Sequence, residues 1–242
     1  MPHHPGSVVA FALAAFALVA VAPSAHACGL TPPLGPNGLP TVCHGEATAV
    51  RFHAGLSLGG TSTSIDFGAD RASLRQGATV ASLDVLPTDA LALTVAAGAS
   101  LGGSVDFRGV SYDLDPGWVA GVGVSYRFFG RGALPFVQPS LGYSIARAAA
   151  VAPDGASAAF TARDWRAGLV IGKAFGPAAP FALARVFGGG TDWSVGGGHG
   201  SDHFRYQVGA GSAFALSDHL DAIVELAFLG ERRATVGVGY TF

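Results

Sequence analysis

The sequence is poor in charge and lacks any long uninterrupted apolar run. Charged residues make up 12% of the 242 residues and hydrophobic residues 50%, whereas a soluble domain usually carries about 25% charged residues. No segment reaches the roughly 18 consecutive apolar residues that indicate a membrane-spanning helix. The chain is therefore too apolar for an ordinary soluble domain, yet it lacks the helices with which most membrane proteins cross lipid.

Positive charge is scarce as well. Lys173 is the single lysine and the net charge is −2, so there is no electrostatic case for nucleic acid as a partner. Glycine, by contrast, is abundant, with 36 residues. A membrane β-barrel reconciles these features, because its strands alternate lipid-facing and lumen-facing residues and so spread the apolar residues thinly along the sequence.

The N-terminal region has the pattern of a secretory signal peptide. Val8–Ala22 is an apolar run of 15 residues that Pro23 ends, and Ala25–Ala27 forms a small-x-small cleavage pattern. We expect residues 1–27 to be removed, although no Lys or Arg precedes the apolar run. Cleavage would leave Cys28 first. A lipoprotein is an alternative, which Ala25 disfavours because lipoproteins favour leucine at that position.

Two cysteines, Cys28 and Cys43, are present. An exported chain enters an oxidising compartment, where a disulfide between them is the default expectation. Their spacing is too wide for a compact metal or redox pair. We predict that residues 28–46 form a proline-rich leader, stapled by this disulfide, that lies in the periplasm or inside the barrel mouth.

From Ala47 onward the apolar residues recur with a period of two, which indicates strands. The pattern predicts an all-β fold, a transmembrane antiparallel up-and-down β-barrel of about ten strands over residues 47–242, with eight strands as the alternative. The expected strands lie near residues 49–59, 76–86, 91–101, 118–128, 136–146, 162–174, 181–187, 204–214, 220–228 and 234–242.

The expected connections alternate in length. Short turns alternate with long loops, which we place at residues 60–71, 103–115, 148–159 and 188–202. Bacterial barrels keep short turns in the periplasm and long loops outside. The sequence therefore predicts an integral protein of the bacterial outer membrane with both termini in the periplasm.

The last strand ends on an aromatic residue. Val236, Val238, Tyr240 and Phe242 form its apolar face. This pattern resembles the C-terminal β-signal of bacterial outer-membrane proteins. The chain as a whole resembles the small OmpA-like or porin-like barrels of Gram-negative bacteria. That resemblance implies outer-membrane lipid, lipopolysaccharide and the barrel-assembly machinery as partners.

Polar residues on the opposite strand faces are expected to point into the lumen. Because buried charges persist only when paired, they would form either an ion-pair network that plugs the barrel or the lining of a thin pore. Arg185 is expected to face inward or lie near a rim, because an arginine facing mid-membrane lipid would cost about 2–4 kcal/mol. The inward residues are Arg51, His53, Asp84, Arg127, Gln138, Asp164, Arg166, Arg205, Gln207 and Glu225.

Two outer segments carry acids and histidines. Asp113 and Asp115 match the Asp-x-Asp of the omptin proteases, but Asp202 and His203 are adjacent where omptins have Asp-x-His. The segment that begins at His199, with Ser201, resembles the His-x-Ser of lipid A deacylases. It lacks the Asn and Glu that follow in that family.

We therefore predict a structural or surface-interacting barrel without catalysis, cofactor or metal. A narrow passive pore is the first alternative and a rim hydrolase, of the omptin or deacylase kind, the second. No external ligand is indicated by the sequence.

Overall fold

The structure is a computed structural model that describes residues 28–31, 41–43, 50–88, 90–129, 135–195 and 198–242. The signal peptide expected at residues 1–27 lies outside the described residues, as does most of the leader. Within the described part, no helix is long and apolar enough to cross a membrane. Two short strands, β1 (Cys28–Thr31) and β2 (Thr41–Cys43), pair with each other, and the remaining strands form one antiparallel sheet.

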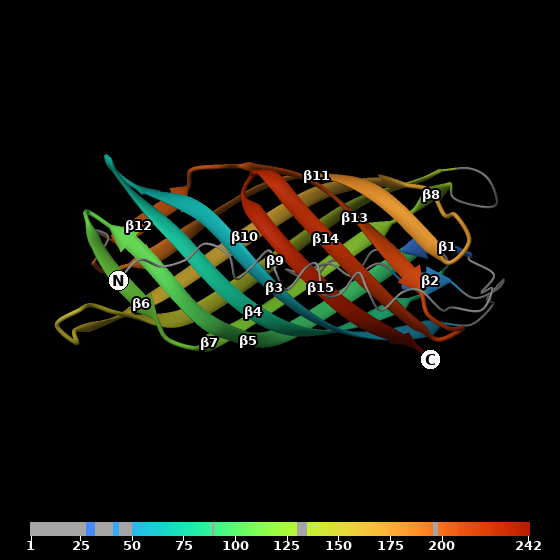
Figure 1. Ribbon diagram of the computed structural model, residues 1–242, viewed down its shortest axis with the longest axis horizontal. Coiled ribbons are helices and arrows are strands. Elements are labelled where there is room, and N and C mark those ends of the chain that lie inside the picture. Colours follow the sequence, from blue (N-terminus) through green and yellow to red (C-terminus); the bar gives the residue numbers. More distant parts are fainter. Residues whose placement is uncertain (1–27, 32–40, 44–49, 89, 130–134, 196–197) are drawn as a thin grey trace.

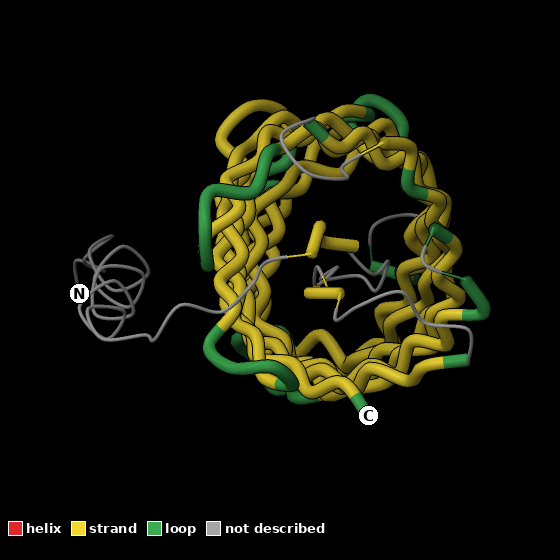
Figure 2. Tube along the Cα trace, turned by 90° about the vertical axis from the view of Figure 1, so that its right-hand side faces the viewer, coloured by secondary structure: helices red, strands yellow, loops and turns green. Residues whose placement is uncertain are grey.

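That sheet closes on itself into a barrel, seen from the side in Figure 1 and from one end in Figure 2. It contains thirteen strands. Their bounds are β3 (Arg51–Phe67), β4 (Asp70–Leu86), β5 (Leu91–Phe107), β6 (Val110–Leu114), β7 (Gly117–Tyr126), β8 (Phe128–Phe129), β9 (Phe136–Val151), β10 (Ser157–Gly172), β11 (Ala178–Trp193), β12 (Gly198–Asp202), β13 (Tyr206–Ala215), β14 (Leu220–Gly230) and β15 (Arg232–Thr241).

The barrel is ten strands wide at one end and eight at the other. We call the end that holds Arg51 and Phe242 the terminal end, and the opposite one the far end. Pairing of β15 with β3 closes a ring of ten at the terminal end, namely β3, β4, β5, β7, β9, β10, β11, β13, β14 and β15.

The β14–β15 hairpin is short, which explains the change in width. Its tip lies at Gly230–Arg232, and beyond it β12 pairs directly with β3 through Ser201↔Asp66 and Asp202↔Ile65. Eight strands therefore surround the far end, namely β3, β4, β5, β6, β9, β10, β11 and β12. The expected strand number of about ten is confirmed, and the alternative of eight describes the far half.

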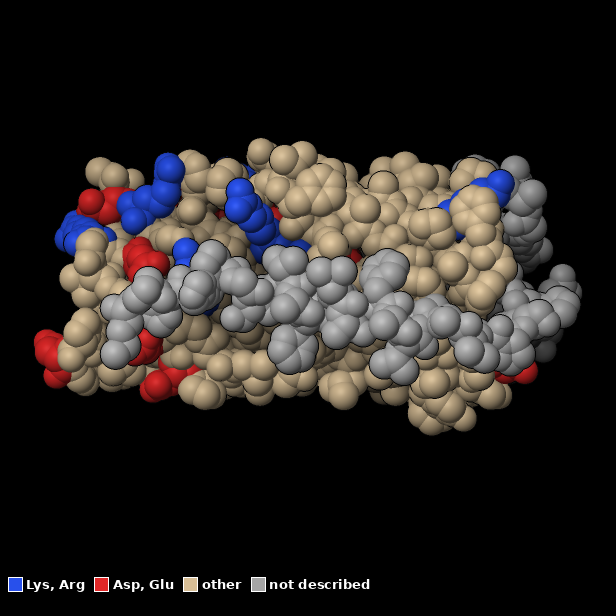
Figure 3. Space-filling model, viewed as in Figure 1, with Lys and Arg blue, Asp and Glu red and all other residues tan. Residues whose placement is uncertain are grey.

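Side chains alternate across the wall as a period of two requires. On β3, Phe52 and Leu56 are exposed on the outer face, whereas His53 and Ser57 are buried on the inner face. Large exposed apolar residues recur in this way on nearly every long strand. In Figure 3, uncharged residues cover most of the wall, and charged residues gather toward the far end. This apolar band is the surface expected to meet lipid.

The expectation of four long outer loops is wrong. Those segments are continuations of the strands, and they end in tight turns such as Gly68 (φ 62°) and the pair Arg108 (φ 50°) and Gly109 (φ 79°). Positive φ at two successive residues suits a two-residue hairpin turn. The alternation inverts beyond the apolar band: on β3 the outward Ser64 is polar and the inward Ile65 is apolar. Because the outer faces of these hairpins are polar, their sequences led to the prediction of solvent-exposed loops.

Candidate functional site: the filled lumen and the far rim

An aromatic cluster occupies the lumen at the far end. Trp193, only 1% exposed, meets Phe67, Phe107 and Phe160 edge-on, with ring centroids 5.6 to 5.9 Å apart. The ring of Tyr112 packs at 90° to it, with centroids 4.9 Å apart. These side chains come from five strands around the barrel, so their packing closes the far end as a core would. The sequence did not reveal this cluster, because Phe67, Phe107, Tyr112 and Trp193 fall in segments expected to be loops and Phe160 directly follows one.

Below the aromatic cluster, arginines and carboxylates bridge the lumen. Arg166 on β10 donates two hydrogen bonds to Glu231 at the β14–β15 tip, over 2.7 and 3.0 Å. Arg185 on β11 donates two to Glu225 on β14, over 2.6 and 2.7 Å. Gln207 joins the pairs, because it accepts from Arg185 and donates to Glu231. Two-point pairing of this kind holds both partners in fixed orientations.

Little free space remains beside this network. The cavity between Arg166, Arg185 and the small residues Ser140, Gly142 and Gly168 has a volume of about 20 Å³. One water molecule needs roughly 10–15 Å³ measured in this way. This cavity therefore has room for about one water molecule.

A buried histidine connects three strands nearer the terminal end. His53 on β3 is hydrogen-bonded through Nδ1 to Asp84 on β4 and through Nε2 to Asp221 on β14, each over 3.0 Å. Thr94 donates to the other oxygen of Asp84, over 2.5 Å. The ring passes over β15 at Gly239, where a Cβ would lie 2.1 Å from Nε2. Glycine at this position is what lets His53 reach β14.

Apolar side chains fill the other side of the terminal end. Phe136, Phe181, Leu183 and Ile223 pack together in the lumen, each at most 7% exposed. This settles the face of β11: Phe181 and Leu183 point inward together with Arg185, and no bulge is needed. Figure 2, which looks into the terminal end, also shows β1 and β2 inside the ring.

Nine of the ten residues expected to face inward are buried or half-buried on inner strand faces or at their ends. Arg205 is the exception: it is exposed in the break between β12 and β13. Its strand begins at Tyr206, two residues later than expected, so the alternation does not extend to Arg205. Glu231 is 4% exposed and was missed, because a glutamate beside a turn glycine normally indicates a solvated tip. Here the tip lies in the wall of the barrel.

The far rim carries two histidine–carboxylate pairs on the outer surface. His199 Nδ1 lies 3.0 Å from Asp192 and His203 Nδ1 lies 2.8 Å from Asp66. Arg71 and His203 hold the pKa of Asp66 below its usual value, since both donate hydrogen bonds to its carboxylate. The hydrogen bond from His199 likewise lowers the pKa of Asp192. Both carboxylates therefore stay ionised and orient their imidazoles.

Ser201 lies between these two pairs. It is the cross-strand partner of Asp66 on one side and of Gly190 on the other. The imidazole of His199 leans over Gly190, where a Cβ would lie 2.2 Å from Cε1. The imidazole of His199, oriented by Asp192, therefore lies over Gly190, which is the cross-strand partner of the outward-facing Ser201.

The other rim candidates lie apart from this serine. Asp113 is exposed on the outer face of β6, and Asp115 directly follows that strand. Three strands separate β6 from β12 in either direction around the ring, so Asp113 and His199 occupy opposite sides. Asp202 is paired with the inward Ile65. Because Asp113 and His199 both lie on outer strand faces, they point away from each other and do not face across the rim as in the omptins. In the described part of the chain, no group of three or more His, Cys, Asp or Glu residues could hold a metal.

Comparisons with known proteins address the fold. No family model matches the chain, and no curated protein matches it. Among solved structures, it is similar to the translocator domain of autotransporter NalP from Neisseria meningitidis, with 12% identity, 81% of this chain and 89% of that chain covered, and a TM-score of 0.50. The outer membrane protease OmpT from Escherichia coli also aligns, with 12% identity, 80% and 96% coverage and a TM-score of 0.49. At such identity the likeness concerns the fold alone. The chain therefore has the fold of an outer-membrane β-barrel protein, which supports an integral place in the bacterial outer membrane.

Proposed function

We propose that this protein is a closed outer-membrane barrel with a structural or surface-interacting role, and that it neither conducts solutes nor catalyses a reaction. One observation carries the proposal: side chains fill the lumen at three successive levels. These are the aromatic cluster around Trp193, the Arg166–Glu231 and Arg185–Glu225 network, and the terminal-end layer of His53 and the apolar cluster. Each ion pair in the middle level is held at two points, which fixes both partners across the lumen.

The proposal includes an orientation and a route of assembly. We place the terminal end in the periplasm, because its turns would then face the compartment from which barrels insert. Val238, Tyr240 and Phe242 point outward at this end, where the barrel-assembly machinery would read them as a β-signal. Outer-membrane lipid and lipopolysaccharide would surround the apolar band.

Solute flux tests the closed lumen. The protein is purified from membranes, reconstituted into liposomes and exposed to a gradient of arabinose, with a general porin as a positive control. We expect swelling no faster than in protein-free liposomes. Swelling that rises with the amount of folded protein would contradict a closed lumen and support the narrow pore.

A second candidate function rests on Ser201, His199 and Asp192 at the far rim. In an ester hydrolase of this type, His199 would take the proton of Ser201 while its Oγ attacks the ester carbonyl. The same proton would then pass to the departing alcohol, and water would release the acyl group from Ser201. The observation that favours it is that Asp192 holds the imidazole over Gly190, the cross-strand partner of Ser201.

Covalent labelling tests the second candidate. A fluorophosphonate probe should label the folded protein at Ser201, and both Ser201→Ala and His199→Ala should abolish the labelling. Ser111→Ala, at an exposed serine on β6, is the matched control and should not change it. Absence of labelling in the wild-type protein would contradict the hydrolase and leave the closed barrel standing.

A further inference from the structure

Arg75 and Arg232 are two neighbouring arginines on the outer wall that have no carboxylate partner among the described residues. Arg232 on β15 and Arg75 on β4 are both exposed, and neither makes an ion pair with any described residue. Three other exposed arginines of the far half, Arg71, Arg108 and Arg163, pair with Asp66, Asp70 and Asp192. Arg147 and Arg205 are also exposed and make no ion pair with a described residue. Arg75 and Arg232 thus present free guanidinium groups.

The register of the sheet brings these two arginines together. Arg232 is the cross-strand partner of Ser62 on β3, and Ser62 is the partner of Arg75. The three residues form one row and point to the outer face. Neighbouring strands lie about 4.8 Å apart, so the two arginine Cα atoms are separated by about 10 Å. Both side chains can reach a group held above Ser62, whose hydroxyl lies between them.

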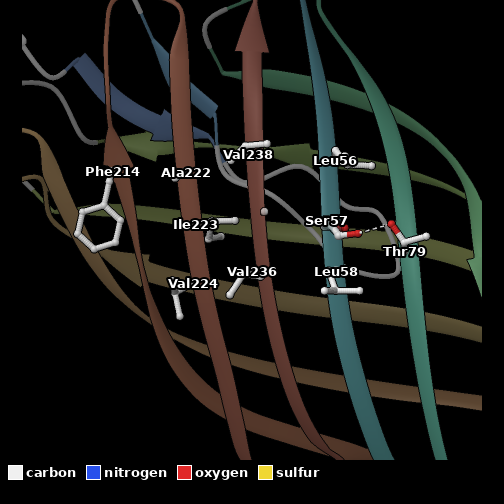
Figure 4. A pocket seen from close by; sticks show the side chains of 11 residues that line it. Leu56, Ser57, Leu58, Thr79, Phe214, Ala222, Ile223, Val224, Val236 and Val238 are labelled. Atoms are coloured by element: carbon white, nitrogen blue, oxygen red, sulfur yellow. Dashed lines mark hydrogen bonds between the residues drawn. The ribbon is translucent and has the colours of Figure 1, made fainter. Parts of the chain in front are cut away.

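An apolar hollow lies farther down the same strands, as Figure 4 shows. Leu56 and Leu58 on β3, Val236 and Val238 on β15 and Val224 on β14 line it. Val236 follows Arg232 by four residues, or about 13 Å of strand. The wall therefore presents a cationic row, then an apolar surface long enough for part of an acyl chain.

We propose that Arg75, Ser62 and Arg232 bind the phosphate head group of a membrane lipid whose acyl chain lies in this hollow. Guanidinium groups suit phosphate because their paired N–H donors match two phosphate oxygens. Arg205, exposed in the break before β13, adds a further positive charge near the β14–β15 tip.

The nearby carboxylates leave this row positive. Asp66, on the same face of β3, is already engaged by Arg71 and His203. Asp106, exposed on β5 as the partner of Ser73, lies one strand from Arg75 and offsets part of the charge of that arginine. Asp113 lies two strands from Arg75, beyond Ser104. Arg232 has neither of these carboxylates beside it. The proposal requires the barrel to lie in a membrane, and it does not depend on whether the lumen conducts.

Native mass spectrometry of the purified protein tests the site. Micelles are supplied with dioleoyl phosphatidate or with dioleoyl phosphatidylcholine, whose choline cation opposes the arginines, and bound lipid is counted. Wild-type protein should retain phosphatidate in preference. The double variant Arg75→Gln with Arg232→Gln should bind phosphatidate at least roughly tenfold more weakly, as expected for losing charged hydrogen bonds.

Arg147→Gln is the matched control, because Arg147 is another exposed arginine but its cross-strand partners are Trp118 and Thr161. It should leave phosphatidate binding unchanged. Ala222→Phe, which fills part of the hollow, should weaken phosphatidate binding without changing the affinity of the protein for inorganic phosphate. Equal binding of the two lipids, an equal effect of Arg147→Gln, or displacement of phosphatidate by inorganic phosphate alone at equal concentration would overturn the proposal.

Discussion

At the scale of single residues, alternation predicts the face of a side chain but not its partner. The period of two placed His53 and Asp84 on the inner wall. Nothing local in the sequence links His53 to Asp221, which lies 168 residues away. That contact depends on strand order, on shear and on a glycine in the strand between them. For the same reason, the sequence could not show that Glu231 turns inward to meet Arg166.

Gly239→Ala tests the contact between His53 and Asp221. An added Cβ would lie 2.1 Å from His53 Nε2 and would displace the ring from Asp221. Breaking a buried charged pair costs about 3–5 kcal/mol, so the free energy of unfolding should fall by about that amount. Urea unfolding of the refolded protein in detergent micelles measures it.

Gly60→Ala is the control for this substitution, because a Cβ there meets nothing within 4 Å. It should change the unfolding free energy by less than about 0.5 kcal/mol, as surface substitutions usually do. Equal effects of the two substitutions would show that His53 does not need the space at Gly239.

At the scale of strands and turns, the sequence predicted the lipid-crossing segments well and their far continuations poorly. The outer faces of β5 and β7 carry Leu93, Val95 and Val122, and lipid selects for this apolar signal. Beyond the apolar band, the outer face of the strands meets water and the inner face packs against aromatic side chains. The apolar residues therefore move from the outer face to the inner face. A prediction that expects an apolar outer face along the whole strand takes such a segment for a loop.

The β1–β2 hairpin makes a prediction about the two cysteines. Cys28 and Cys43 are direct cross-strand Cα partners, a placement within the range of Cα separations that disulfides span. We expect no free thiol in the denatured, unreduced protein and two after reduction, as counted by maleimide mass shift. A Cys28→Ser variant should show one free thiol without reduction. Two thiols in unreduced wild-type protein would contradict the pairing, and one would indicate a lipid on Cys28.

The turns make a prediction about orientation. An epitope inserted at Asp154–Gly155, in the far-end turn between β9 and β10, should bind antibody on intact cells. The same epitope at Ser217–Asp218, in the terminal-end turn between β13 and β14, should bind only after the outer membrane is permeabilised. The reverse pattern would place the terminal end outside the cell and contradict periplasmic termini.

At the scale of the whole molecule, the barrel narrows from ten strands to eight, while the filling of its lumen changes from mixed polar and apolar side chains to an aromatic cluster. The sequence predicted a closed β-barrel, its approximate number of strands and the inward position of most polar residues. These features follow from period-two patterning and strand length. The filling of the lumen was not predicted, since it depends on which layers of side chains meet across the barrel. Phe160 is the direct cross-strand partner of Trp193, whereas Phe67 meets Trp193 from β3, which lies beyond β12.

Ion conductance across a planar bilayer tests the closed lumen most directly. The folded protein is inserted from detergent, and insertion is verified by protease protection before recording. The account predicts no current steps above the protein-free baseline, because the layers around Trp193, Arg166 and His53 each block the path. Reproducible steps whose ion selectivity changes with Arg127→Gln or Glu225→Gln would contradict it and show that the lumen is a pore.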